Sequence, residues 1–315
     1  MSQRVVILVC LMLGAVAPCA VAQAQETTGV VTEIKPGHGK AEIRNAGGVW
    51  RPAAPLQALR PGDEVRASAD ASVVVLLSGG RGIVKVDAKS SPLVMTPTAD
   101  DGKIGKARAL VTSTVTFLTS GAKEAPKAVL ATRAMRPAEI LTPRNGPVLP
   151  QTVVFEWIGS PLSRYTVRVL GPADVVLERT AVVGARFVYP PDAPVLQPGV
   201  SYRFQVVALN QPPYETTFEV VETARAQAVQ NDLRDLEAGL SANASPSSIA
   251  IARAGALAAS GLMHDARLVV VAALARDPDE PVLHTLLGTL YARTGLPQQA
   301  AECFDEADFL LGKNR

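Results

Sequence analysis

Apolar residues recur at helical spacing over the last third of the chain, and the pattern occurs twice, 34 residues apart. Both copies keep the order of small and larger apolar positions, and each has a glycine where a helix must end with positive φ. The matched positions are Arg253, Ala254, Leu257, Gly261, Ala266, Val270 and Ala273 in the first copy, and Leu287, Gly288, Tyr291, Gly295, Ala300, Phe304 and Ala307 in the second. The pattern predicts two helical hairpins within residues 247–311.

A further helix is predicted just before these hairpins. Between residues 223 and 240, apolar side chains recur at spacings of four, three and four, which gives one apolar stripe. The stripe consists of Val229, Leu233, Leu236 and Leu240. Two hairpins are fewer than the three or so units that a free helical array needs. We therefore expect this helix to support them.

The first part of the chain has a β pattern. Short runs of β-branched and alternating residues are separated by turn pairs of glycine and proline between residues 29 and 98. The runs begin at Gly29, Lys40, Asp63 and Val73. Residues 99–137 read as a connector, in which residues 107–118 fit a helix with Leu110, Val111, Thr114, Val115 and Leu118 on one side. The many threonines and valines in this stretch favour a strand, but we expect the helix because the apolar residues fall on one side.

Six further strand candidates follow in residues 138–221, at the spacing of a β-sandwich. They begin at Val153, Tyr165, Val175, Arg186, Tyr202 and Thr216. The fold class predicted from the whole pattern is multidomain, with two β domains followed by a helical domain.

The first residues have the composition of an export signal. Arg4 precedes an apolar run from Val5 to Val16, and small-x-small cleavage sites end at Ala22 and Ala24. The run is short for a membrane-spanning helix, so cleavage near Ala24 is expected rather than a retained anchor. A lipoprotein signal at Cys19 fits less well because Pro18 precedes it. The sequence therefore predicts an exported protein, periplasmic or secreted, with no membrane span after cleavage.

Charge and residue usage exclude several functions. Residues 25–137 carry 16 Lys and Arg against 10 Asp and Glu, so an anionic surface could attract them. There is no basic run interleaved with aromatics, and nucleic acid is not an expected partner. The three histidines, His38, His264 and His284, lie far apart and have no metal-ligand spacing. No catalytic motif is present, so we expect no enzyme, cofactor or metal.

Three resemblances follow from these residues. The 34-residue pattern resembles the tetratricopeptide repeat, although Arg253 occupies a slot that is usually leucine. An ordinary helical bundle is the alternative. The stretch with Gly29-Val-Val, Leu59-Arg-Pro-Gly62-Asp63 and the strand from Ser72 resembles the periplasmic FecR-type domain. Family members that signal carry a cytoplasmic segment before a membrane helix, and only residues 1–4 precede the apolar run here.

The third resemblance lies in the second β region. Leu196-Gln-Pro198-Gly199-Val-Ser-Tyr202 resembles the tyrosine corner of fibronectin type III and Ig-like domains, and Trp157 matches their core tryptophan. This resemblance implies that the Tyr202 hydroxyl bonds back to the backbone. The expected domains are a signal peptide (1–24), a FecR-like β domain (25–98), a connector (99–137), a fibronectin-like sandwich (138–221) and a helical tetratricopeptide-repeat domain (222–315).

The resemblances imply a non-catalytic envelope protein that acts as a scaffold or binding module for a protein partner. In tetratricopeptide arrays the first helix of each pair lines a concave groove, and this implies that Thr285, Thr289 and Arg293 are candidate partner-binding residues. The alternative for these residues is that the helix at 223–240 fills the groove, so that they belong to the core. The alternative function is a cell-wall or glycan-binding module that uses the basic FecR-like domain.

Overall fold

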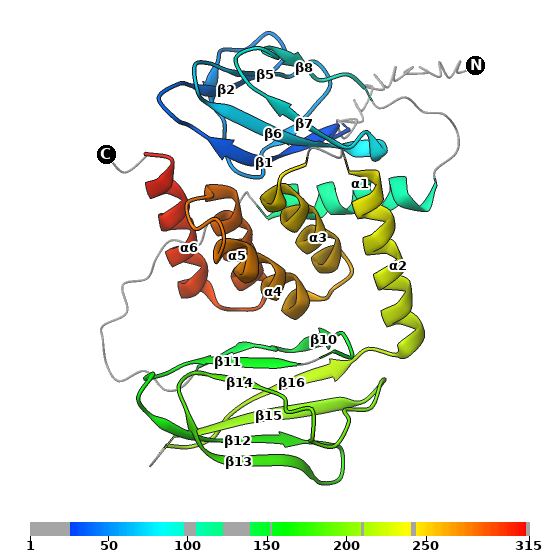
Figure 1. Cartoon of the computed structure of the whole chain (residues 1–315), viewed down its shortest axis with the longest axis vertical. Helices are drawn as coiled ribbons and strands as arrows, with labels where there is room; N and C mark the ends of the chain where they lie inside the picture. Colours follow the sequence, from blue (N-terminus) through cyan, green and yellow to red (C-terminus); the bar gives the residue numbers. More distant parts are fainter. Residues whose placement is uncertain are drawn as a thin grey trace, which may run out of the picture.

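The computed structural model describes residues 26–97, 105–121, 139–151, 153–208, 211–240 and 244–312. They form three layers, with a β domain at each end and the helices between them (Figure 1). The order of β domains followed by C-terminal helices confirms the coarse fold class. The expected signal peptide at residues 1–24 lies outside the described residues.

The N-terminal β domain consists of two four-stranded sheets. One has the order β4-β1-β6-β7 and the other β3-β2-β5-β8. The strands are β1 (Gly29–Lys35), β2 (Ala41–Arg44), β3 (Arg51–Pro52), β4 (Ala58–Leu59), β5 (Glu64–Ala67), β6 (Ser72–Leu77), β7 (Ile83–Val86) and β8 (Leu93–Val94). Six of the seven residues of β1 are buried, because β4 and β6 flank this strand within its sheet and the helical layer packs against it (Figure 1).

The second β domain packs a five-stranded sheet, β10-β16-β15-β12-β13, on a three-stranded sheet, β14-β11-β9. Its strands are β9 (Glu139–Thr142), β10 (Gly146–Val148), β11 (Val154–Ile158), β12 (Arg164–Leu170), β13 (Val175–Val183), β14 (Arg186–Val188), β15 (Ser201–Ala208) and β16 (Tyr214–Val220). Trp157, Phe155, Phe204 and Phe218 fill the core between the sheets. The backbone N–H of Gln197 donates to the Tyr202 hydroxyl oxygen at 2.7 Å, which confirms the expected corner bond.

The C-terminal helices of the middle layer are α2 (Thr223–Gly239), α3 (Pro246–Ala259), α4 (Met263–Leu274), α5 (Pro281–Arg293) and α6 (Pro297–Leu310). Gly261 and Gly295 adopt φ of 84° and 76°, as the turns of the two hairpins require. The Arg253 guanidinium forms an ion pair with Glu237 of α2, which explains a charged residue in an otherwise apolar position. Helix α2 thus packs against the first hairpin, as expected.

The connector contributes a helix, α1 (Lys106–Ser120), where threonine and valine favour a strand. Thr112, Thr114, Thr116 and Thr119 each donate their hydroxyl to the carbonyl four residues earlier. Val111, Val115 and Leu118 are buried in a core shared by the N-terminal β domain and the C-terminal helices, whereas the second β domain has its own core. Burial of this apolar side stabilises the helix against the local preference.

Candidate functional site at the inner face of the helical domain

We define the inner face as the side of α3 and α5 on which the repeat pattern places the candidate residues. Thr285 is 9% exposed and Thr289 is 2% exposed. Each donates its hydroxyl to a carbonyl one turn earlier, from Thr285 to Pro281 and from Thr289 to Thr285, both at 2.9 Å. Arg293, at the end of α5, is exposed. Two of the three candidates, Thr285 and Thr289, are therefore buried, and Arg293 lies at the exposed edge of the inner face.

Helix α1 covers this face. A Cβ placed on Gly255 of α3 would lie 2.9 Å from Thr114 Cγ2 and 3.0 Å from Leu118 Cδ2. At the other end, a Cβ placed on Gly121 would lie 2.2 Å from Thr289 Cγ2 of α5. Small residues on α3 and after α1 thus permit a contact that larger side chains would prevent. The groove is filled by the chain itself, but by α1 rather than by the expected helix at 223–240.

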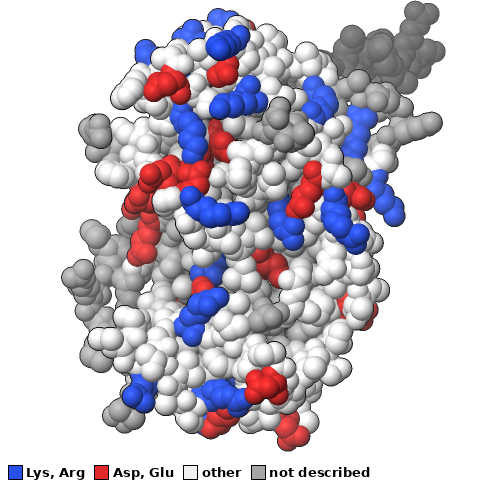
Figure 2. Space-filling view, viewed as in Figure 1, with Lys and Arg blue, Asp and Glu red and all other residues white. Residues whose placement is uncertain are grey.

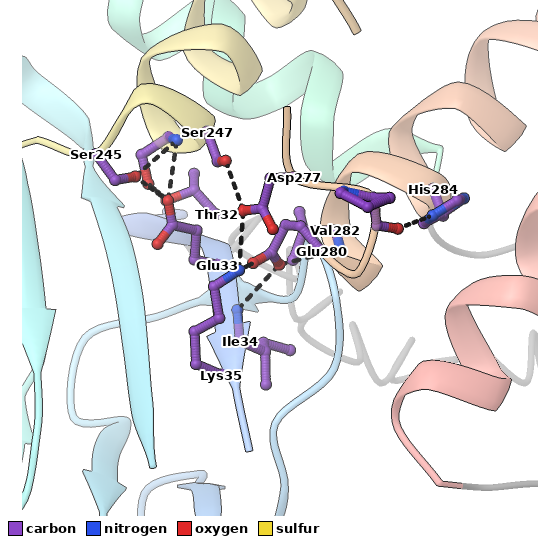
Figure 3. A network of polar contacts seen from close by, with 12 residues as sticks. Thr32, Glu33, Ile34, Lys35, Ser245, Ser247, Asp277, Glu280, Val282 and His284 are labelled. Carbon is purple, nitrogen blue, oxygen red and sulfur yellow. Dashed lines mark hydrogen bonds and ion pairs between the residues drawn. The ribbon is translucent and has the colours of Figure 1, made fainter. Parts of the chain in front are cut away.

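Strand β1 closes the end of the inner face where α3 and α5 begin (Figure 3). The Glu33 carboxylate accepts hydrogen bonds from the Ser248 backbone N–H and hydroxyl, both at 3.1 Å, and from the Ser245 hydroxyl. Glu280 accepts from the backbone N–H of Ile34 at 3.2 Å and of Val282 at 3.3 Å. A carboxylate at a helix N-terminus satisfies free N–H groups and the positive end of the helix dipole. The N-terminus of the first helix in each hairpin is therefore capped by a glutamate, α3 by Glu33 and α5 by Glu280.

Lys35 compensates the negative charge of this network (Figure 3). Its Nζ lies 2.9 Å from Asp277 Oδ2 and 2.9 Å from Glu280 Oε2. Burial raises the pKa of Glu280 to about 7, against the opposing effect of Lys35. Burial also raises the pKa of Glu33, opposed by the Ser248 hydrogen bonds. The network therefore joins β1 to the N-terminal ends of α3 and α5.

Arg293 connects the inner face with a surface groove. Its Nη2 donates to Ser120 Oγ at 2.6 Å, and its guanidinium carbon lies 4.4 Å from the centre of the Phe117 ring. A hollow of about 940 Å³ runs along the outer side of α1 at this point. We call it the α1 groove, and its lining includes Glu26, Thr27, Ser78, Arg108, Thr112, Ser113, Thr116, Phe117, Ser120 and Arg293.

Other side chains that could carry chemistry are accounted for by local structure or burial. The Asp63 carboxylate accepts from the backbone N–H of Arg60 at 2.9 Å and from the Asn45 amide at 3.2 Å, as in a turn. His284 Nε2 lies 2.7 Å from the Pro278 carbonyl. Burial raises the pKa of the Cys303 thiol to about 12. Within the described ranges, no group of three or more His, Cys, Asp and Glu residues could hold a metal ion.

Comparison with known proteins does not assign the chain to a family. No protein-family model matches the chain, and no curated protein matches it. Among the described residues, none of the helices combines the length and the apolar character needed to cross a bilayer.

The role of α1 in covering the inner face was not predicted from the sequence. The small residues Gly121 and Gly255 are the signal of close packing that could have indicated it.

Proposed function

We propose that this protein is a non-catalytic, exported envelope protein that serves as a scaffold or binding module for a protein partner. In this proposal the N-terminal domain is FecR-like, the second is fibronectin-like and the helices are tetratricopeptide-like. The order of two β domains and helical hairpins with positive-φ turn glycines supports it. On the face drawn in Figure 2, basic and acidic side chains are interspersed, which suits a protein partner better than a nucleic acid.

The observation that carries the proposal is the position of Arg293 beside α1. A bare inner face would expose Thr285 and Thr289 to the partner, but the end of α1 covers Thr289, and Thr285 is buried as well. Arg293 instead borders the α1 groove together with the hydroxyls of Thr112, Thr116 and Ser120. The partner surface that we propose is therefore a composite of α1 and the end of α5.

The α1 groove combines polar groups at Arg293 and along α1 with apolar lining from Ala109, Val115 and Ala259. The Thr112, Thr116 and Ser120 hydroxyls donate to helix carbonyls, so they offer a ligand their oxygens as acceptors. An arginine recognises a carboxylate through two parallel N–H groups. Phe117 is 6% exposed and contributes little apolar surface. We propose that the partner presents a peptide segment with polar side chains and one carboxylate, which binds at Arg293.

A pull-down from envelope extract tests this proposal. The mature chain is compared with Arg293→Glu, which reverses the charge at the groove, and with Arg276→Glu, which makes the same change at an exposed site outside it. We expect a protein that the wild type and Arg276→Glu retain and that Arg293→Glu loses. If no protein separates the two variants, the groove is not the partner site.

A second candidate function, glycan or cell-wall binding, is supported by Trp50 in the N-terminal β domain. The guanidinium carbons of Arg44 and Arg66 lie 4.7 Å and 4.0 Å from the centre of its ring. The same arginines pair with Glu64 and Glu42, both at 2.7 Å. An aromatic ring held by charged neighbours is a surface on which a sugar ring can stack. Retention on purified cell wall that Trp50→Ala abolishes and Arg293→Glu leaves intact would favour this function.

A further inference from the structure

A second cavity lies where the second β domain meets the helical domain. Its volume is about 240 Å³. The loop between β9 and β10 contributes Arg144, the start of α4 contributes His264 and Arg267, and the end of α5 contributes Tyr291 and Arg293. The volume is too small for a folded partner and suits a small molecule. This site is independent of the proposed protein-binding groove, apart from Arg293, which borders both.

Arg267, which lines this cavity, has an unused donor. The residue is 7% exposed, and its Nη2 lies 2.6 Å from Glu156 Oε2. Its Nε and Nη2 donate to the Tyr291 hydroxyl oxygen at 3.2 Å and 3.1 Å. Its Nη1 is buried and has no hydrogen-bond partner among the described residues. A buried N–H group without an acceptor is costly, so this nitrogen marks a place where an acceptor is expected.

Two more donors line the same cavity. The Tyr291 oxygen accepts two bonds from Arg267, so its own O–H must be donated elsewhere, and the described residues supply no acceptor. Arg144 donates its Nε to the Thr294 carbonyl and its Nη1 to the Ile140 carbonyl, both at 2.9 Å. Its Nη2 forms no hydrogen bond with a described residue. The unmet hydrogen-bonding capacity of the cavity is therefore mainly that of donors.

The charges of the cavity have the same sense. His264 Nδ1 lies 2.7 Å from Thr142 Oγ1, and burial, aided by the Arg267 charge, lowers the His264 pKa to about 3, so the ring is neutral. Glu156 neutralises Arg267, and Glu139 lies 3.8 Å from Arg144 Nη1. Arg144 and Arg267 thus each lie near one carboxylate, whereas Arg293, which borders the cavity with its guanidinium on Ser120 and Phe117, forms no ion pair with a described residue.

We propose that this cavity binds a small oxyanion, either a carboxylate or a phosphate group, across the junction of the second β domain and the helices. The oxyanion carries acceptors only, and it complements the free Arg267 Nη1, the Tyr291 hydroxyl and Arg144. Binding there also links the β9–β10 loop to α4 and α5. A bound anion therefore stabilises the junction by mass action and raises the melting temperature.

Titration calorimetry and thermal unfolding of the full mature chain test this site, with inorganic phosphate and succinate as the probes. We expect saturable binding of at least one probe at millimolar concentration, with a rise in melting temperature. Arg144→Gln removes one cationic donor and should weaken binding by about tenfold. Arg267→Lys keeps a positive charge for Glu156 but removes Nη1, and it should weaken binding similarly.

The control is Arg186→Gln. Arg186 pairs with the other oxygen of Glu156 at 3.2 Å and does not line the cavity, so this change should leave affinity unaltered. Circular dichroism verifies that each variant is folded. Absence of saturable binding by the wild type would overturn the proposal and leave water as the occupant. Equal affinity of the wild type, Arg144→Gln and Arg267→Lys would also overturn it, because the anion would then bind elsewhere.

Discussion

Gly121 lies so close to Thr289 that a Cβ on the glycine would be 2.2 Å from Thr289 Cγ2. Gly121 directly follows α1, and Thr289 belongs to α5. The contact fixes the end of α1 on the inner face of the helical domain. A residue first considered as a partner contact is therefore packed against another part of its own chain.

Thr289→Glu should destabilise the helical domain. The longer side chain does not fit beneath Gly121, where a Cβ on the glycine would already be 2.2 Å from Thr289 Cγ2, and overpacking of this kind costs about 1–3 kcal/mol. Arg293→Glu, at an exposed position on the same helix, should keep the fold. Circular dichroism during denaturant unfolding measures both. Normal stability of Thr289→Glu would mean that α1 leaves the inner face readily.

Gly255→Ala should lower stability, although alanine is normally the better helix former. The added methyl group would lie 2.9–3.0 Å from Thr114 and Leu118, and overpacking of this kind costs about 1–3 kcal/mol. Gly239→Ala is the matched control, because a Cβ at the end of α2 meets no atom within 4 Å. Urea titrations should therefore show a lower free energy of unfolding for Gly255→Ala than for the wild type. For Gly239→Ala the free energy of unfolding should be unchanged or higher. Equal gains for both variants would contradict the docking of α1.

Tyr202→Phe should cost about 1 kcal/mol, because the N–H of Gln197 loses its hydrogen bond to the buried Tyr202 side chain. Tyr214→Phe on β16 is the control, since the Tyr214 hydroxyl forms no hydrogen bond with a described residue. Melting curves of the mature chain and of the separate 138–221 segment provide the measurement. If the melting curve of Tyr202→Phe coincided with that of the wild type, the hydrogen bond between Gln197 and Tyr202 would not contribute to stability.

His264 should make the protein less stable in acid. In the unfolded chain its pKa is 6.5, whereas burial lowers the folded value to about 3. As the pH falls below 6.5 the unfolded chain gains a proton that the folded chain does not, so the free energy of unfolding decreases. Glu280 and Asp265 have raised pKa values of about 7 and about 6, and they act in the opposite sense by losing stability as the pH rises.

The difference between the wild type and His264→Gln isolates the histidine from these carboxyl groups. Denaturant titrations between pH 7 and pH 4 should give a steeper loss for the wild type than for the variant. Parallel curves would show that His264 is accessible to protons in the folded state, and that the buried ring facing Thr142 and Arg267 is not maintained in solution.

Much of the local structure could be predicted from the sequence. Helical periodicity and a fixed 34-residue offset indicate the hairpins, because the side of a helix that is buried repeats every 3.6 residues. Gly261 and Gly295 mark their turns, since glycine adopts positive φ at little cost. The corner at Tyr202 is likewise a local arrangement, formed over five residues.

What fills the inner face was decided only by the tertiary structure. The threonines and valines of α1 do not favour a helix, and its stability comes from burial among residues far away in the chain, such as Gly255. Ser248 receives its cap from Glu33, 215 residues earlier. The cavity at Arg267 likewise joins three elements that no sequence spacing relates. Such contacts depend on shape complementarity between distant surfaces, whereas periodicity along one segment reports only which side of that segment is buried.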